Sequence, residues 1–357
     1  ASSLIINELQ QSNVDMFVDP SFNYGSWVEL YNPTDKAVSI IGFHVSEDPA
    51  NLKMFRLTPS VGVIPAKGYK VLWFDHNEAD PRQIDFKLDC DGGTFYIADE
   101  NGNLVTLQSY PAAISRTSYA RTTDGANNWG LTALPTPGKS NDGSVFATAR
   151  LDAPIINKDS QLFTSSFIAR VTIPDGATLK YTTDGTTPSA TNGQVSTTGR
   201  FTVNTTTTYR FRLFQDGMLP SEVITRSYIY KDKEFKLPVI SVVTDPVNLY
   251  DDSLGVYVKG VNGRPGNGQS TPCNWNMEWD RPVNFEYITP DGKMAFNQEV
   301  DFAMCGGWSR AWLPHSFKLK AAKVYEGRNS LNYQFFAGKP YLKHKTLQIR
   351  NGGNDNN

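Results

Sequence analysis

Apolar and polar residues alternate along many short runs of this chain. In the first third, such runs cover residues 4–9, 27–31, 38–41, 69–74, 94–98 and 104–107. Period-two alternation is typical of half-buried strands, and Gly, Pro, Asn and Asp turns separate the runs. The pattern predicts an all-β sandwich for residues 1–145. Glu29 alternates with Val28 and Leu30, so we expect its carboxylate on the outer, solvated face of this sandwich.

A second set of alternating runs follows. Residues 167–173, 178–182, 201–203, 207–214 and 223–230 predict another small sandwich, over residues 148–231. The Pro-, Gly-, Ser- and Asn-rich stretch at 135–144 predicts the boundary before it, and the charged residues 231–234 predict a linker after it. We therefore expect the first two segments to fold independently of each other and of the third.

The third segment, residues 235–357, alternates at 301–305, 316–320 and 347–350. Phe317 and Leu319 oppose Lys318 and Lys320, so we expect both lysines on the solvated face of a sheet. A Gly-Gly turn follows Cys305. A sheet with cations on its polar face beside such a turn could present them to a phosphate group.

Ordered motifs give the first two segments family resemblances. Residues 5–8, 27–33, 41–43, 64–68 and 135–141, with Trp129, resemble a lamin-tail domain, which is an immunoglobulin-like sandwich. The string Tyr181-Thr182-Thr183-Asp184-Gly185-Thr186-Thr187-Pro188 resembles the C-terminal domain of chitobiase-type hexosaminidases, which is another immunoglobulin-like sandwich. Both resemblances imply accessory modules for attachment or spacing, not catalysis.

The third segment resembles the N-terminal part of the spore-coat-protein-H (CotH) kinase family. The resemblance rests on Gly307-Trp308-Ser309-Arg310, on the run from Ser316 to Lys320, and on residues 349–355. The stretches 237–242 and 255–258 are similar to the opening strands of that family. His315 stands where the family usually has Lys. In the family, the acidic metal-binding and catalytic residues lie downstream of this region, so the resemblance implies the first lobe of a partial α+β kinase-like domain.

This resemblance implies a tentative nucleotide site. Lys318 or Lys320 would contact the phosphates, Arg310 would lie nearby, and Arg350 and Asp355 would border the site. ATP and a divalent metal are implied for an intact family member, whereas this chain alone is expected to be inactive and to hold no cofactor. The same residues could instead be sheet-face charges paired with their neighbours.

Several other residues invite a chemical interpretation. The glycine-rich stretch 261–268 lacks the Gly-Lys-Ser/Thr ending of a phosphate-binding Walker loop, so a variable loop is favoured. Residues 89–93 predict a plain turn, because most of the acidic ligands of a calcium loop are missing. Among the clustered tryptophans, Trp275 and Trp308 are expected in the core, whereas the pattern does not decide between core and surface for Trp279 and Trp312. His315 and His344 have no nucleophile at a suggestive spacing, so both are expected to be solvated.

Charge and cysteine content narrow the class of protein. Residues 1–145 carry 10 Lys and Arg against 17 Asp and Glu, a net charge of −7, which argues against nucleic-acid binding there. Three scattered cysteines are too few for a disulfide framework; either Cys273 and Cys305 pair or they are buried free thiols. The sequence holds no apolar run long enough to span a membrane.

Together these features predict a mainly β protein with two immunoglobulin-like sandwiches followed by a kinase-like lobe. We expect a secreted, periplasmic or cell-surface protein whose partner is a protein or glycan at the cell surface. The intact protein would transfer phosphoryl groups as an atypical kinase. The alternative is a non-catalytic adhesion or glycan-associated scaffold with a degenerate kinase-like segment.

Overall fold

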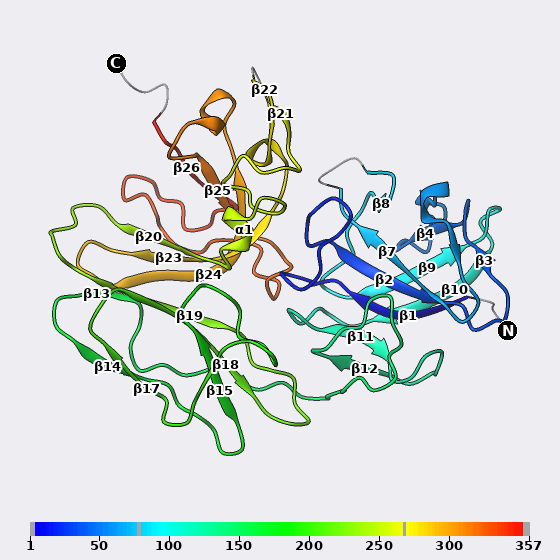
Figure 1. Cartoon of the computed structure of the whole chain (residues 1–357), viewed down its shortest axis with the longest axis horizontal. Coiled ribbons are helices and arrows are strands. Elements are labelled where there is room, and N and C mark those ends of the chain that lie inside the picture. Colours follow the sequence, from blue (N-terminus) through cyan, green and yellow to red (C-terminus); the bar gives the residue numbers. More distant parts are fainter. Residues whose placement is uncertain (1–3, 77–79, 267–268, 353–357) are drawn as a thin grey trace. The chain divides into compact units, whose positions relative to one another are not determined.

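The computed structural model describes residues 4–76, 80–266 and 269–352 and divides into two compact units (Figure 1). Unit 1 comprises residues 1–148 with 323–327, and unit 2 comprises residues 149–322 with 328–357. Both are mainly β: in the described residues, helix is limited to α1 (Val247–Tyr250) and three short 3-10 turns. None of these is long and apolar enough to cross a membrane.

Unit 1 contains a six-stranded and a four-stranded sheet. The first has the order β12 (Trp129–Thr132), β11 (Ser118–Arg121), β1 (Ile5–Gln10), β2 (Ser26–Tyr31), β7 (Tyr69–Phe74) and β8 (Gln83–Ile84). The second has the order β10 (Leu104–Tyr110), β9 (Gly93–Ala98), β4 (His44–Ser46) and β5 (Phe55–Arg56). A small pair, β3 (Val38–Ser39) and β6 (Val63–Ile64), and the 3-10 turn η1 (Pro59–Val61) complete the described elements.

One apolar core joins the strands of unit 1. It includes Leu30 of β2, Phe74 of β7 and Phe95 of β9, all fully buried, and the rings of Phe74 and Phe95 meet edge to face at 5.6 Å. Burial of such side chains stabilises each by about 2 kcal/mol. The alternating runs of the sequence thus place their apolar positions between the two sheets.

The outer face of β2 is covered, and the expectation that Glu29 is solvated is wrong. Its side chain is fully buried; it accepts hydrogen bonds from Asn7 Nδ2 at 2.9 Å and from the backbone N–H of Gly138 at 2.6 Å. Burial, with the nearby carboxylates of Glu8 and Asp124, raises the pKa of Glu29 to about 8. The alternation correctly placed Glu29 on the face of β2 that points away from the apolar core. The loop of residues 135–141 covers this face, so Glu29 is not exposed to solvent.

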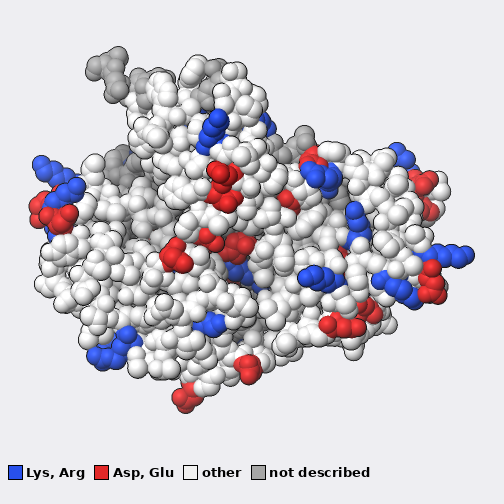
Figure 2. Space-filling view, in the orientation of Figure 1, with Lys and Arg blue, Asp and Glu red and all other residues white. Residues whose placement is uncertain are grey.

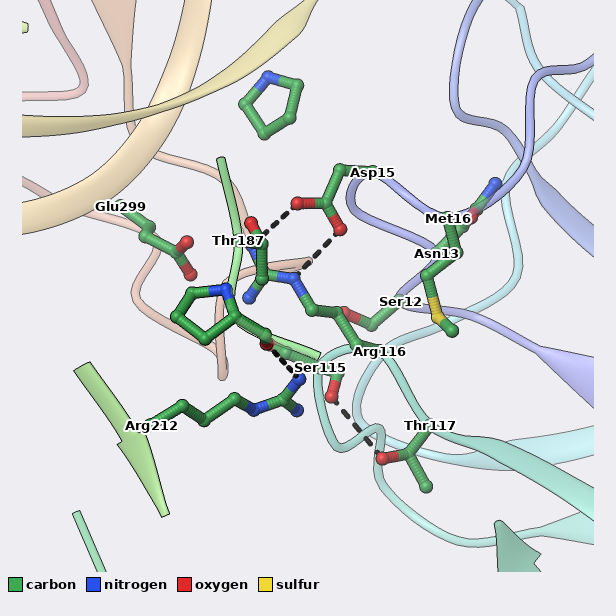
Figure 3. A network of polar contacts seen from close by, with 12 residues as sticks. Ser12, Asn13, Asp15, Met16, Ser115, Arg116, Thr117, Thr187, Arg212 and Glu299 are labelled. Atoms are coloured by element: carbon green, nitrogen blue, oxygen red, sulfur yellow. Dashed lines mark hydrogen bonds and ion pairs between the residues drawn. The ribbon is translucent and has the colours of Figure 1, made fainter. Parts of the chain in front are cut away.

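A second polar network in unit 1 fixes the loops at the ends of β1 and β11. Arg116 has a positive φ of 57° and its guanidinium donates to both carboxylate oxygens of Asp15, at 2.8 and 3.1 Å (Figure 3). Both side chains are largely buried. Because a bidentate Arg–carboxylate pair fixes both distance and orientation, it holds these two loops together.

Unit 2 begins with a sandwich and continues into a separate sheet. The sandwich has a five-stranded sheet in the order β13 (Gln161–Phe163), β19 (Ile224–Tyr230), β18 (Thr207–Phe214), β15 (Thr178–Thr182) and β16 (Gln194–Ser196), and a pair β14 (Phe167–Arg170) with β17 (Arg200–Val203). The third sheet has the order β20 (Val239–Val243), β23 (Arg281–Ile288), β24 (Met294–Met304), β25 (Phe317–Lys320) and β26 (Thr346–Ile349). The hairpin β21 (Arg264–Gly266) and β22 (Gln269–Cys273) precedes the turn η2 (Asn274–Asn276), and η3 (Trp308–Ala311) separates β24 from β25.

Within unit 2, buried polar groups join the sandwich to the third sheet. Glu286 of β23 accepts hydrogen bonds from the hydroxyls of Ser160 and Ser227 and, at 3.1 Å, from Asn297 Nδ2. Its side chain is fully buried, and burial raises its pKa. The sandwich is therefore coupled to the next segment through a desolvated carboxyl group.

An ion pair lies at the same junction. Arg210 of β18 donates to Glu299 of β24 at 3.1 Å, and both side chains are largely buried. Removing one member of a buried pair leaves an uncompensated charge, which costs several kcal/mol. These contacts argue against the expected independence of residues 148–231.

The predicted strand at residues 255–258 is absent. The backbone N–H groups of Val256 and Tyr257 donate instead to the carbonyls of Asn248 and Leu249, at 3.1 and 2.9 Å. Because the end of α1 takes up these donors, the segment cannot pair with a strand, although its composition favours one.

Surface charges are mixed. Among the described residues on the face shown in Figure 2, basic and acidic side chains are interspersed, and no extended positive area is visible. This mixed pattern matches the near-neutral balance of the whole chain, which has a formal net charge of −2.

Candidate functional site

The candidate site lies where β24 ends and the chain turns into β25. The backbone N–H of Cys305 donates to the carbonyl of Ser316 at 3.1 Å, which closes the loop between the two strands. Gly306 has a φ of 95°, and a Cβ at this position would lie 2.5 Å from Ser309 Oγ. Only glycine fits this turn without a shift of its neighbours, because the φ value and the close approach both exclude a side chain.

Three of the predicted cations lie on segments that meet beside Cys305. Lys318 is two residues from Ser316, Arg310 donates to the carbonyl of Gly306, and Arg350 precedes Asn351, whose N–H donates to Ser316 Oγ at 3.0 Å. Burial raises the pKa of the Cys305 thiol, while the positive charges of Lys318, Arg310 and Arg350 act in the opposite direction. Lys318 is half-buried on β25, opposite Ala303 and Gln348, and forms no ion pair with a described residue. The sequence pattern placed Lys318 on a polar face; the fold places two arginines near it.

A small cavity adjoins this cluster. It has a volume of about 190 Å³, and its walls include Arg264, Gly266, Glu278, Gly307 and Arg310. The volume suits a phosphate-sized group. Two segments that are far apart in the sequence, the glycine-rich hairpin and the Gly-Gly turn, therefore meet at one site.

Hydrogen bonds and ion pairs hold Arg310 against the cavity. Its guanidinium donates to the carbonyls of Gly306 and Asn276, at 3.0 and 3.3 Å, and lies 3.5 Å from Glu278. Arg264 lies 3.8 Å from the same carboxylate. Two arginines thus share one partly exposed carboxylate, so the cavity keeps an excess of positive charge.

Lys320 has a different environment from Lys318. It forms an ion pair with Asp280 and is partly buried. Burial alone would lower its pKa, but Asp280, with Asp301 and Glu278, more than offsets this effect and raises it. The Lys320 charge is therefore neutralised by a protein carboxylate. The fifth predicted residue, Asp355, lies outside the described residues.

The burial of His315 and of Trp308 differs from what the sequence predicted. His315 is buried, not solvated: its ring lies 4.5 Å from Tyr257 and 4.9 Å from Trp275, and its Nδ1 has no partner in the described residues. Burial lowers its pKa. Trp308 is 54% exposed, so its expected place in the core is wrong, whereas Trp279 is fully buried against Arg281.

The remaining candidate features of the site are a disulfide bond and a metal centre. Cys273 and Cys305 are both buried free thiols, which resolves the alternative that the sequence left open. Among the described residues, no group of three or more His, Cys, Asp or Glu side chains is arranged to hold a metal ion.

Sequence reasoning did not assign Glu278, Asn276 or Cys305 to this site. Cys305 directly precedes the Gly-Gly turn, which was a usable signal. Glu278 and Asn276 lie about 30 residues upstream without a motif, so only the fold brings them to Arg310.

Comparison with known families concerns the sandwich of unit 2. Residues 160–225 match the family model of the Chitobiase/beta-hexosaminidase C-terminal domain. This part of the chain is similar to that domain, and the resemblance predicted for the second segment is confirmed. No curated protein matches the chain.

The chitobiase-like domain contains the motif that suggested it. Asp184 Oδ1 accepts hydrogen bonds from the backbone N–H and hydroxyl of Thr186, at 3.0 and 2.6 Å, and Arg210 donates to the carbonyl of Gly185 at 3.1 Å. The Thr-Asp-Gly-Thr string therefore forms a turn that Arg210 fixes to β18. The polar groups of Asp184 and Thr186 serve this turn, which agrees with a structural role.

Proposed function

We propose that the third sheet of unit 2 binds the phosphates of a nucleotide, as the nucleotide-binding lobe of a CotH-like atypical kinase domain. The observation that carries this proposal is that Arg310, Lys318 and Arg350 lie on the turn and strand ends next to Cys305, beside a phosphate-sized cavity that Arg310 lines. A cation that is already held in place, as Arg310 is, binds a phosphate without a large ordering cost.

The chemistry would depend on charge neutralisation. Phosphoryl transfer involves little covalent participation of the protein, so positioning of the phosphates and compensation of their charge dominate. Arg310, fixed by two carbonyls and Glu278, would orient a phosphate, while Lys318 would add a mobile point charge. The divalent metal of an intact family member would need further acidic ligands, because the described residues do not form a metal site.

The rest of the chain would serve as accessory modules. Unit 1, with its lamin-tail-like motifs, and the chitobiase-like domain would attach or space the kinase-like lobe on a secreted or cell-surface protein. In support, the polar side chains of the motifs in both sandwiches are used in turns and in loop contacts.

One observation favours a second candidate function, a non-catalytic surface scaffold with a degenerate kinase-like segment. Lys320, one of the two lysines implied for the phosphates, is neutralised by Asp280. In a scaffold, the cations of the third sheet would only stabilise the sheet, and nucleotides would not bind.

A calorimetric titration of the full chain with ATP and with inorganic tripolyphosphate distinguishes the two functions. We expect both ligands to bind. Lys318→Ala should weaken binding by about tenfold, which corresponds to the loss of one charge-assisted contact of about 1.4 kcal/mol. Lys236→Ala, which removes an exposed lysine outside the site, is the matched control and should leave the affinity unchanged. Absence of binding to either ligand would support the scaffold, and equal affinities of the two variants would contradict the role of Lys318.

A further inference from the structure

A segment of unit 2 that the proposed site does not use combines exposed apolar side chains with positive charge. From Gly327 to Ile349 the sequence contains four Lys and Arg and no Asp or Glu. Within it, every residue from 336 to 343 is exposed. We call residues 336–343 the basic loop.

The apolar side chains of the basic loop are large and open to solvent. Phe336, Tyr341 and Leu342 are 52%, 63% and 63% exposed. Single exposed apolar residues are common on protein surfaces, but three within seven residues form a local patch that usually has a binding role.

The base of the loop is firmly held, so this exposure is a property of the fold. Leu331 and His344 exchange backbone hydrogen bonds of 2.7 and 3.0 Å. Phe335 is buried, with its ring 5.8 Å from that of Phe285 and 5.3 Å from that of Phe296.

Further contacts fix the loop itself. The N–H of Lys339 donates to the carbonyl of Phe336 at 2.9 Å, and Gln334 Nε2 donates to the carbonyl of Lys339 at 2.8 Å. A fixed base thus presents an amphipathic tip, whose backbone needs little ordering when the loop binds.

The loop's lysines are available to a partner. Neither Lys339 nor Lys343 forms an ion pair with a described residue. Lys345, just outside the loop, instead donates to Asn329 Oδ1. The loop thus combines two unpaired ammonium groups with three exposed apolar side chains. A partner that complements both must be anionic and must also offer an apolar phase.

We propose that the basic loop docks on an anionic lipid surface. Phe336, Tyr341 and Leu342 would enter the boundary between headgroups and acyl chains, while Lys339 and Lys343 would contact lipid phosphates. A nucleic acid or another polyanion fits less well, because it offers no apolar phase to Leu342.

Co-sedimentation of the full chain with lipid vesicles tests this proposal. We expect binding to vesicles of equal parts phosphatidylcholine and phosphatidylglycerol, and much weaker binding to pure phosphatidylcholine. The double variant K339Q/K343Q should weaken binding by roughly tenfold or more, since each lysine near such a surface contributes about 1 kcal/mol. L342S should also weaken it.

Matched controls are available elsewhere in unit 2. Lys236→Gln and Leu237→Ser change an exposed lysine and a leucine that is 77% exposed, and both should bind as the unchanged chain does. Thermal unfolding of each variant checks that it folds, and Lys343→Arg, which keeps the charge, should retain binding even if other variants are unstable.

Three results would overturn the proposal. The first is no preference for the anionic vesicles, and the second is equal loss of binding in the loop and control variants. The third is loop-dependent binding to soluble tripolyphosphate or to an oligonucleotide with none to vesicles. The ATP titration uses other residues, so failure of one proposal is distinguishable from failure of the other.

Discussion

Replacing Glu286 by alanine is expected to destabilise unit 2 by roughly 3 kcal/mol, because the change opens a cavity and leaves the hydroxyls of Ser160 and Ser227 and the amide of Asn297 without their buried partner. Since these groups come from both the chitobiase-like domain and the third sheet, the two should lose stability together. Urea unfolding of the full chain measures the effect.

The matched control is Glu286→Gln. Glutamine keeps the size of the side chain and an acceptor oxygen, and burial already favours the neutral form of Glu286. We expect it to cost much less than alanine. A loss below about 0.5 kcal/mol for Glu286→Ala, the range typical of surface substitutions, would show that the two parts of unit 2 are not coupled through this carboxyl group.

Unit 1 is expected to lose stability as the pH rises from about 5 to about 9. The pKa of Glu29 in the folded protein is raised from 4.5 to about 8, so the folded state binds more protons than the unfolded chain across this interval. Its contribution is complete below pH 4.5 and is lost as the pH rises through 8. A shift of this size corresponds to a few kcal/mol.

Other buried carboxyls of unit 1 act in the same direction. Burial raises the pKa of Asp19 to about 6 and that of Glu47 to about 7, and it also raises that of Glu8. The pKa of Asp124 is lowered, so its contribution changes only at more acidic pH. Denaturant midpoints from pH 5 to pH 9 measure the sum of these effects.

Glu29→Gln isolates the contribution of this residue. It should flatten the upper part of the profile, because glutamine is neutral at every pH and can still accept from Asn7 and Gly138. Asp35→Asn, which changes an exposed carboxylate, should leave the profile unchanged. A wild-type profile that is level between pH 5 and pH 9 would contradict the burial of Glu29.

Local pattern was sufficient to predict most strands. The runs at 69–74, 178–182 and 207–214 coincide with β7, β15 and β18, because alternation directly reports a half-buried sheet face. It failed for Glu29 because a loop more than 100 residues downstream covers that face. The strand at 255–258, which the family resemblance implied, is absent because the end of α1 takes the N–H groups of Val256 and Tyr257.

The site was predictable to a similar degree. Alternation placed Lys318 and Lys320 on one polar face, and the family resemblance implied that one of them contacts the phosphates with Arg310 nearby. The difference between Lys318 and Lys320 was not predictable, because both occupy the same polar face and only the fold brings Asp280 to Lys320. Likewise, Trp279 and Trp308 have similar local surroundings in the sequence, and only tertiary packing buries the first and exposes the second.

The most direct test of the nucleotide-phosphate site is affinity labelling with an acyl-phosphate derivative of ATP, which acylates the lysine nearest to the bound phosphates. We expect peptide mass spectrometry to find the label on Lys318 and excess ATP to prevent it. Lys320, which is paired with Asp280, should be labelled much less. Labelling that is spread over exposed lysines such as Lys236 and is insensitive to ATP would contradict the account.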